Sequence, residues 1–179
     1  LQLAPKNADA MGGLGIIALR RSEHAQAEQY FSQAMAQAPA TTKWRQMHDT
    51  ARLWALLRRG NDALDSGDTP TASRMAEQAL TLQPQNPEAQ GLQANTLAAQ
   101  GHTAEAEHAW KALLNRDPSH MPAVRALVRM YLAQQRVQDA EHLLAQLPPA
   151  TDTDTSGLRA DLLQARAEVA LAHNQPAKA

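Results

Sequence analysis

The sequence predicts an all-α protein, an α-solenoid of stacked antiparallel helix hairpins with one inserted helix that is unpaired or extended. A spaced pattern of small, aromatic and proline residues recurs along the 179 residues. The prolines that close this pattern are twice separated by 34 residues. Hydrophobic residues make up 44% of the chain but aromatic residues only 3%. These observations predict closely packed, alanine-rich helices in a repeating stack.

Residues 8–40 carry the pattern in its fullest form. Gly15 and Ala27 stand where the two helices of a hairpin cross, and their small size lets the axes approach to about 8 Å. Phe31 fills the space beside that crossing. Pro39 ends the second helix, because proline lacks an N–H and restricts the residue before it. One hairpin cannot bury its apolar face alone, so the pattern predicts further hairpins packed against it.

The closing prolines set the expected boundaries of the repeats. Pro5 and Pro39 are 34 residues apart, as are Pro84 and Pro118, whereas the interval from Pro39 to Pro84 is 45 residues. The middle interval therefore contains eleven extra residues. The predicted order is the tail of a preceding repeat at 1–6, a repeat at 8–40, an inserted helical segment at 41–52, repeats at 53–86, 87–120 and 121–148, a loop at 149–156, and the first helix of a further, truncated repeat at 157–179.

The inserted segment has the periodicity of a helix. Its apolar residues recur at intervals of three or four positions: Trp44, Met47, Ala51, Trp54 and Leu57. Eleven residues make about three helical turns, so one long helix over 41–67 would keep its apolar face in phase. A separate short helix that breaks near Asp49 and Thr50 is the alternative. In both cases we expect the segment to interrupt the regular superhelix, because it has no second helix of its own.

Composition limits the classes of function. The net charge is −1 and the pI is about 6.7, which argues against nucleic acid as a partner. The chain has no cysteine for a disulfide or thiolate metal site, and no apolar run long enough for membrane insertion. No signal peptide is recognised in it. Phosphate-binding and nucleophile motifs are missing, and the scattered histidines predict no metal site. We therefore expect no enzyme activity and no cofactor.

The recurring residues of 8–40 and of the later repeats resemble those of the tetratricopeptide-repeat family, and the resemblance covers nearly the whole chain. It implies a scaffold for protein–protein interaction that binds partners on a concave face built by the first helices. The alanine- and glutamine-rich residues 76–89 and 98–106 are similar to the periplasmic repeat region of the bacterial cellulose synthase operon protein C family. That resemblance implies a periplasmic location and a role in cellulose or exopolysaccharide export, with protein partners of an envelope or secretion complex.

Polar residues on the expected concave face are the candidate partner-binding residues. Asn61 and Asn95 hold the same position in successive repeats, which would place two amides in a ladder. Arg125 and Arg129 are one turn apart and would bind a carboxylate or phosphate together. For each of them an ordinary solvated helix residue is the alternative interpretation. The full set is Arg20, Asn61, Asp65, Asn95, Arg125, Arg129 and Glu168.

Trp44 and Trp54 are candidate aromatic anchors on the inserted segment. They are ten residues apart, close to three turns, and exposed tryptophans there would stack on sugar rings or anchor a protein partner. The alternative is packing of the segment against its neighbours. A carbohydrate-binding surface that guides a glucan chain, and a generic adaptor or co-chaperone, are therefore the other functions considered. The carboxylate clamp of the co-chaperones is not expected, because Gly12 and Ile16 stand where it needs polar residues.

Overall fold

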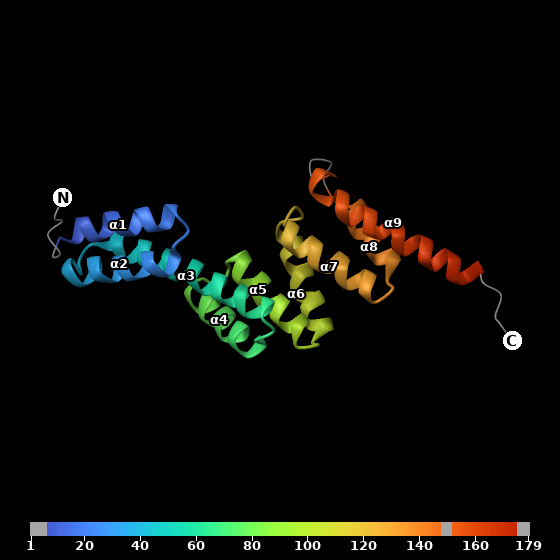
Figure 1. Ribbon diagram of the computed structural model, residues 1–179, viewed down its shortest axis with the longest axis horizontal. Coiled ribbons are helices and arrows are strands. Elements are labelled where there is room, and N and C mark those ends of the chain that lie inside the picture. Colours follow the sequence, from blue (N-terminus) through green and yellow to red (C-terminus); the bar gives the residue numbers. More distant parts are fainter. Residues whose placement is uncertain (1–6, 148–151, 175–179) are drawn as a thin grey trace. The chain divides into compact units, whose positions relative to one another are not determined.

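The computed structural model describes residues 7–147 and 152–174, and this part of the chain contains nine helices and no strand (Figure 1). The predicted tail at 1–6 lies outside the described residues. The chain forms two compact units, Leu1–Ala99 and Gln100–Ala179. The helices of the first are α1 (Ala8–Arg20), α2 (His24–Gln37), α3 (Thr42–Asp65), α4 (Thr69–Leu82) and α5 (Pro87–Ala99); those of the second are α6 (Thr103–Arg116), α7 (Met121–Ala133), α8 (Val137–Ala145) and α9 (Asp152–Asn174).

Helices α1 and α2 form the hairpin that the small residues predict. The side chain of Asn7 accepts hydrogen bonds from the backbone N–H groups of Asp9 and Ala10, and so caps the start of α1. A Cβ atom at Gly15 would lie 2.6 Å from the Phe31 ring, so this position admits glycine alone without a shift of the ring. Ala27 and Phe31 are fully buried at the crossing. The hairpin thus packs as closely as glycine and alanine permit.

Helix α3 is one continuous helix of 24 residues, which decides between the two alternatives for the inserted segment. The polar residues near its middle are accommodated without a break. The hydroxyl of Thr50 donates to the carbonyl of Gln46 at 2.9 Å, inside the same helix. On the neighbouring α2, Glu28 lies 4.0 Å from both His48 and Arg52. The helix therefore continues from its N-cap Thr41 to Asp65 without a helix end or a second N-cap between them.

The amino-terminal half of α3 packs against the α1–α2 hairpin. The rings of Trp44 and Phe31 stack with their centroids 6.3 Å apart, and Ala51 is fully buried in the same cluster. Gly12 on α1 lies directly beneath the Trp44 indole, where a Cβ atom would overlap the ring. The extra turns of α3 thus complete the core of the first hairpin.

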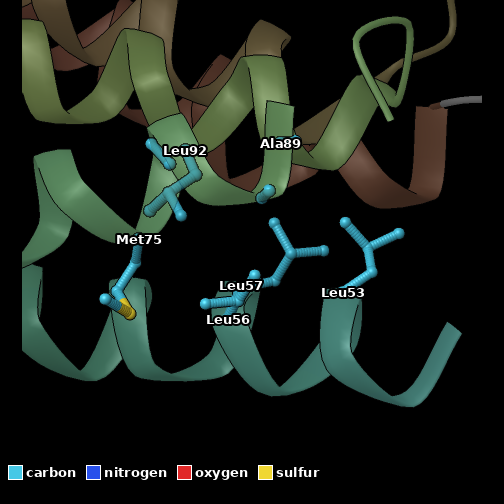
Figure 2. Packing of buried hydrophobic residues seen from close by; sticks show 8 residues of the cluster. Leu53, Leu56, Leu57, Met75, Ala89 and Leu92 are labelled. Carbon is cyan, nitrogen blue, oxygen red and sulfur yellow. The ribbon is translucent and has the colours of Figure 1, made fainter. Parts of the chain in front are cut away.

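The carboxyl-terminal half of α3 forms a second cluster with α4 and α5, shown in Figure 2. Leu53, Leu56 and Leu57 project from α3 toward Met75 of α4 and toward Ala89 and Leu92 of α5; all six are buried. Between α3 and α4, Gly67 has a φ angle of +79°, a backbone conformation that favours glycine. The one helix α3 therefore belongs to both hydrophobic clusters of the first unit.

The second unit is likewise built of packed helices around an apolar interior. Its interior contains Trp110 and Leu113 of α6, Val124, Leu127 and Val128 of α7, Ala140 and Leu144 of α8, and Leu158 and Leu162 of α9. Trp110 is only 4% exposed. Among the described residues, no helix combines the length and hydropathy that a membrane crossing requires.

The predicted loop at 149–156 is wrong in its bounds. Helix α9 already begins at Asp152, so the predicted start at residue 157 is five residues too late. The stretch of alternating threonine and aspartate indicates a loop by composition, but the same residue types are favoured at helix N-termini. Residues 148–151 lie outside the described residues, as do 175–179 at the end of the predicted truncated repeat.

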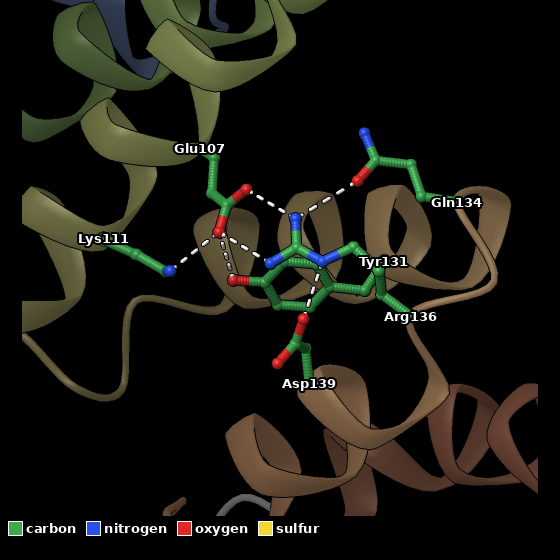
Figure 3. Close-up of polar contacts among 6 residues, drawn as sticks. All are labelled: Glu107, Lys111, Tyr131, Gln134, Arg136 and Asp139. Atoms are coloured by element: carbon green, nitrogen blue, oxygen red, sulfur yellow. Dashed lines mark hydrogen bonds and ion pairs between the residues drawn. The ribbon is translucent and has the colours of Figure 1, made fainter.

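Glu107 of α6 is the centre of an ion-pair network in the second unit (Figure 3). Its carboxylate accepts hydrogen bonds from Arg136 at 2.7 and 3.1 Å, from Lys111 at 2.7 Å and from the Tyr131 hydroxyl at 3.1 Å. Arg136 lies over the Tyr131 ring at 4.4 Å and also binds Asp139 at 2.6 Å. The network joins α6 to α7, to α8 and to the turn between these two helices.

The network lowers the pKa of Glu107 to about 2 from its usual 4.5. The hydrogen bonds from Arg136 are the main cause, and partial burial opposes them. The same contacts raise the pKa of Lys111 and of Arg136. Since every charge in the network has a partner, we assign it to stabilisation of the fold.

Substitution of Gly12 by alanine tests the packing of α3 on the first hairpin. The new Cβ atom overlaps the buried Trp44 ring, so we expect Gly12→Ala to lower the free energy of unfolding by about 1–3 kcal/mol. Gly13→Ala is the matched control, because no atom beyond its chain neighbours and its own helix backbone lies within 4 Å of its Cβ position, and alanine favours the helix by about 1 kcal/mol. Urea unfolding measures both; equal stability of the two variants would contradict this packing.

Substitution of Glu107 by glutamine tests the ion-pair network. The pKa of Glu107 is lower in the folded state, so its stabilisation is present above pH 4.5 and is lost as the pH falls toward 2. We expect Glu107→Gln to cost about 2 kcal/mol of unfolding free energy at pH 7 and almost nothing near pH 2. The exposed Glu105 on the same helix is the control, and Glu105→Gln should cost less than about 0.5 kcal/mol. A pH-independent loss would rule out the charge as the cause.

Candidate functional site

A groove runs along the exposed face of α3 in the first unit. It consists of two clefts of about 330 and 310 Å³ that share His24, Arg58 and Asp62. One cleft lies against the start of α2 and the turn before it; the other reaches the start of α5 at Glu88. We call this surface the α3 groove. The residues that line it are Ser22, Glu23, His24, Ala25, Gln26, Trp54, Ala55, Leu57, Arg58, Arg59, Asn61, Asp62 and Glu88.

Helical spacing brings the polar residues of α3 to the groove. Trp54, Arg58 and Asn61 follow one another at intervals of four and three residues, so they share one face of the helix. Leu53 and Leu56 of the second cluster lie on other sides of α3, and Leu57 lies at the border between that cluster and the groove. The exposed stripe and the core thus arise from the same helical period.

Trp54 and His24 form a stacked pair across the groove. Their ring centroids are 6.1 Å apart with an angle of 27° between the planes, and 40% of Trp54 is exposed. Within the described part of the chain, the buried Nδ1 atom of His24 has no hydrogen-bond partner. Burial of the ring, and secondarily the charge of Arg58, lower the pKa of His24 below 6.5, so the imidazole is neutral at pH 7. A neutral ring therefore supports one side of an exposed indole.

Arg58 ties α3 to the turn between α1 and α2. Its Nη1 atom donates to the Ser22 carbonyl at 3.4 Å, where Ser22 has a φ angle of +58°. The side chains of Asn61, Asp62 and Glu88 form no hydrogen bond or ion pair with other described residues. The α3 groove thus has one anchored guanidinium and three polar groups that are available to a ligand.

The structure separates the two predicted aromatic anchors. Trp54 lies in the α3 groove, whereas Trp44 is only 4% exposed and packs on Phe31. Ten residues of α-helix fall about 80° short of three full turns, which is enough to turn the second indole from the core to the surface. Trp44 therefore follows the alternative interpretation, in which the inserted segment packs against its neighbours.

The other predicted binding residues of the first unit are spread over three helices and do not form one site. Asn61 lines the α3 groove, and Asp65 is exposed one turn further along the same helix. Asn95 is half-buried on α5 and is not among the residues that line the two clefts. Arg20 is exposed in the last turn of α1. The proposed amide ladder thus has only Asn61 in the groove.

The predicted residues of the second unit lie on two of its helices. Arg125 and Arg129 are exposed one turn apart on α7 and form no hydrogen bond or ion pair with other described residues. Glu168 is exposed on α9 and accepts a hydrogen bond from Gln164 at 3.0 Å. The two arginines remain a predicted surface for an acidic partner.

A cleft of about 290 Å³ lies between α6, α7 and α8 of the second unit. Lys111, Tyr131 and Asp139 at its edge belong to the Glu107 network, and His142 lies 2.7 Å from the side chain of Gln146. The polar side chains of this cleft other than Asn115 are thus engaged with partners, whereas Asn61, Asp62 and Glu88 of the α3 groove are not. Among the described residues no group of histidines and carboxylates is arranged to hold a metal ion.

Sequence reasoning missed His24, Arg58 and Asp62 as members of the site. Arg58 carried a usable signal, because it lies midway between Trp54 and Asn61 on their face of the helix. For His24 the sequence contains no such signal. His24 belongs to α2, and the sequence does not tell how far a residue of α2 lies from Trp54 of α3. The site is assembled by packing of α2 and α5 beside α3.

Comparison with known proteins identifies similar repeats and similar chains. A family model described as tetratricopeptide repeat matches residues 63–130 and 97–166, and a second one with the same description matches residues 1–40. The chain is 33% identical over 170 residues to cellulose synthase operon protein C of Xanthomonas axonopodis pv. citri (strain 306), and this alignment covers 93% of the chain. It is 28% identical over 172 residues, again 93% of the chain, to cellulose synthase 1 operon protein C of Komagataeibacter xylinus.

A third relative is cellulose synthase operon protein C of Pseudomonas fluorescens (strain SBW25), 27% identical over 142 residues that cover 79% of the chain. These relatives are much longer proteins. The aligned part is 11%, 13% and 11% of their respective lengths. The likeness therefore concerns one segment of each relative.

Proposed function

The chain belongs to the tetratricopeptide-repeat family, and on that premise we propose that it is a non-catalytic scaffold for protein–protein interaction in the synthesis and export of bacterial cellulose or a similar exopolysaccharide. The observation that carries this proposal is the alignment of 93% of the chain with a relative named cellulose synthase operon protein C. The outer residues of the stacked helices are exposed and do not take part in the core, so they can form an extended surface that binds partners.

The proposed partners are proteins of an envelope or secretion complex, and the proposed location is the periplasm. The location rests on the resemblance of residues 76–89 and 98–106 to a periplasmic repeat region. The partner surface rests on the exposed side chains of the first helices, such as Arg125 and Arg129 on α7. Two guanidinium groups one turn apart favour an acidic segment of the partner, since each forms paired hydrogen bonds with a carboxylate.

Site-specific photo-crosslinking in cellulose-producing cells tests the proposal. We expect a photoreactive amino acid in place of Arg129, on the first helix of its repeat, to crosslink to a protein required for cellulose synthesis. Gln138 on α8 is the matched control, because it is also exposed but lies on the second helix of the same repeat. Charge reversal at Arg125 should weaken the crosslink at position 129.

Two results would contradict the proposal. The first is crosslinking of equal strength at positions 129 and 138, which would indicate nonspecific contact. The second is a crosslink at position 129 to proteins unrelated to polysaccharide synthesis. Either result would remove the scaffold role in cellulose synthesis, while the family assignment would stand.

A further inference from the structure

The α3 groove presents one flat apolar surface within polar surroundings. The Trp54 indole is 40% exposed, and the His24 ring stacks against it with 6.1 Å between the ring centroids. The other apolar residues in the lining are small or largely buried, such as Ala55 and Leu57. A protein anchor residue would need a larger apolar pocket than this single ring offers.

The charges along the groove are mixed. Glu23, Asp62 and Glu88 are acidic, whereas Arg58 and Arg59 are basic, and His24 is neutral at pH 7. Such a surface has no one-sided field for an anionic or cationic polymer. A ligand without net charge suits it best.

The hydrogen-bonding groups of the groove offer both donors and acceptors. Carboxylates of Asp62 and Glu88 accept, the Arg58 guanidinium donates, and the Asn61 amide does both. Hydroxyl groups also donate and accept, and the C–H face of a sugar ring packs on an indole. One ligand class, the neutral sugars, therefore matches the aromatic surface, the mixed charge and the unengaged polar groups together.

We propose that the α3 groove binds a neutral oligosaccharide chain, with a sugar ring stacked on Trp54 and its hydroxyl groups bound by Asn61, Asp62 and Glu88. The inference rests on the proposed function for the choice of sugar, a β-linked glucan. The scaffold would then contact the polymer itself on the first unit. Arg58 acts as a positioning residue, because its bond to the Ser22 carbonyl anchors the α1–α2 turn from which His24 begins α2.

Titration of the 179-residue chain with cellohexaose, an uncharged β-linked glucose hexamer, tests this site by NMR. The chain has three tryptophans, so three indole N–H signals report separately. We expect a saturable shift of the Trp54 signal and of the Asn61 side-chain amide, with the signals of the buried Trp44 and Trp110 unchanged. The affinity should fall at least tenfold in Trp54→Ala.

A pair of aspartates on α3 supplies the matched control. Asp62 lines the groove and Asp65, one turn further on, does not. We expect Asp62→Asn to weaken cellohexaose binding about fivefold and Asp65→Asn to leave it unchanged. This pair keeps the test valid if Trp54→Ala disturbs the fold.

Several results would overturn the inference. They are no shift at about 10 mM cellohexaose, equal shifts of all three indoles, and equal affinity of the Asp62 and Asp65 variants. If Trp54 instead crosslinks to a protein and cellohexaose does not displace it, the groove is a protein-binding surface. The scaffold proposal is tested on α7 of the other unit, so failure of the sugar site and failure of the scaffold role give different results.

Discussion

The continuity of α3 is the constraint on which the first unit depends. One helix of 24 residues supplies Trp44 and Ala51 to the cluster of the α1–α2 hairpin, and Leu53 and Leu56 to the cluster of α4 and α5. The two clusters are therefore coupled through a rigid backbone, although they contain different side chains. A break in the helix would leave each cluster with only part of its apolar contacts.

The same continuity creates the α3 groove. Because the two clusters cover the apolar side of the helix, its remaining face is exposed over about two turns, from Trp54 to Asn61. The first cluster holds the start of α2 beside that face and the second holds the start of α5 beside it. His24 and Glu88 thus reach one groove from distant parts of the sequence.

The architecture was predictable where spacing alone determines it. The pattern of Gly15, Ala27 and Phe31 predicts the close helix crossing. The eleven extra residues before the second repeat fitted either one long helix or a separate short one, and only the structure decides for the long helix. The start of α9 was not predictable from the sequence, because threonine and aspartate are typical both of loops and of helix N-termini. To predict that Trp44 and Trp54 point in different directions, the angle between them around the helix has to be calculated, because ten residues fall about 80° short of three full turns.

The groove was predictable only in part, for a physical reason. Trp54 and Asn61 share the surface of one helix, so their spacing places them together. The stack of His24 on Trp54, the bond from Arg58 to the Ser22 carbonyl and the approach of Glu88 all depend on the packing of separate helices. A single sequence contains no distance between such residues, and only the folded chain brings them together.

Hydrogen exchange of the backbone amides along α3 tests the account most directly. If α3 is one helix that joins two clusters, the amides from His48 to Leu53 exchange as slowly as those in the leucine-rich half near Leu56 and Leu57. Fast exchange confined to Asp49 and Thr50, between two slowly exchanging segments, would show two separate helices. That result would contradict both the coupling of the clusters and the shared support of the α3 groove.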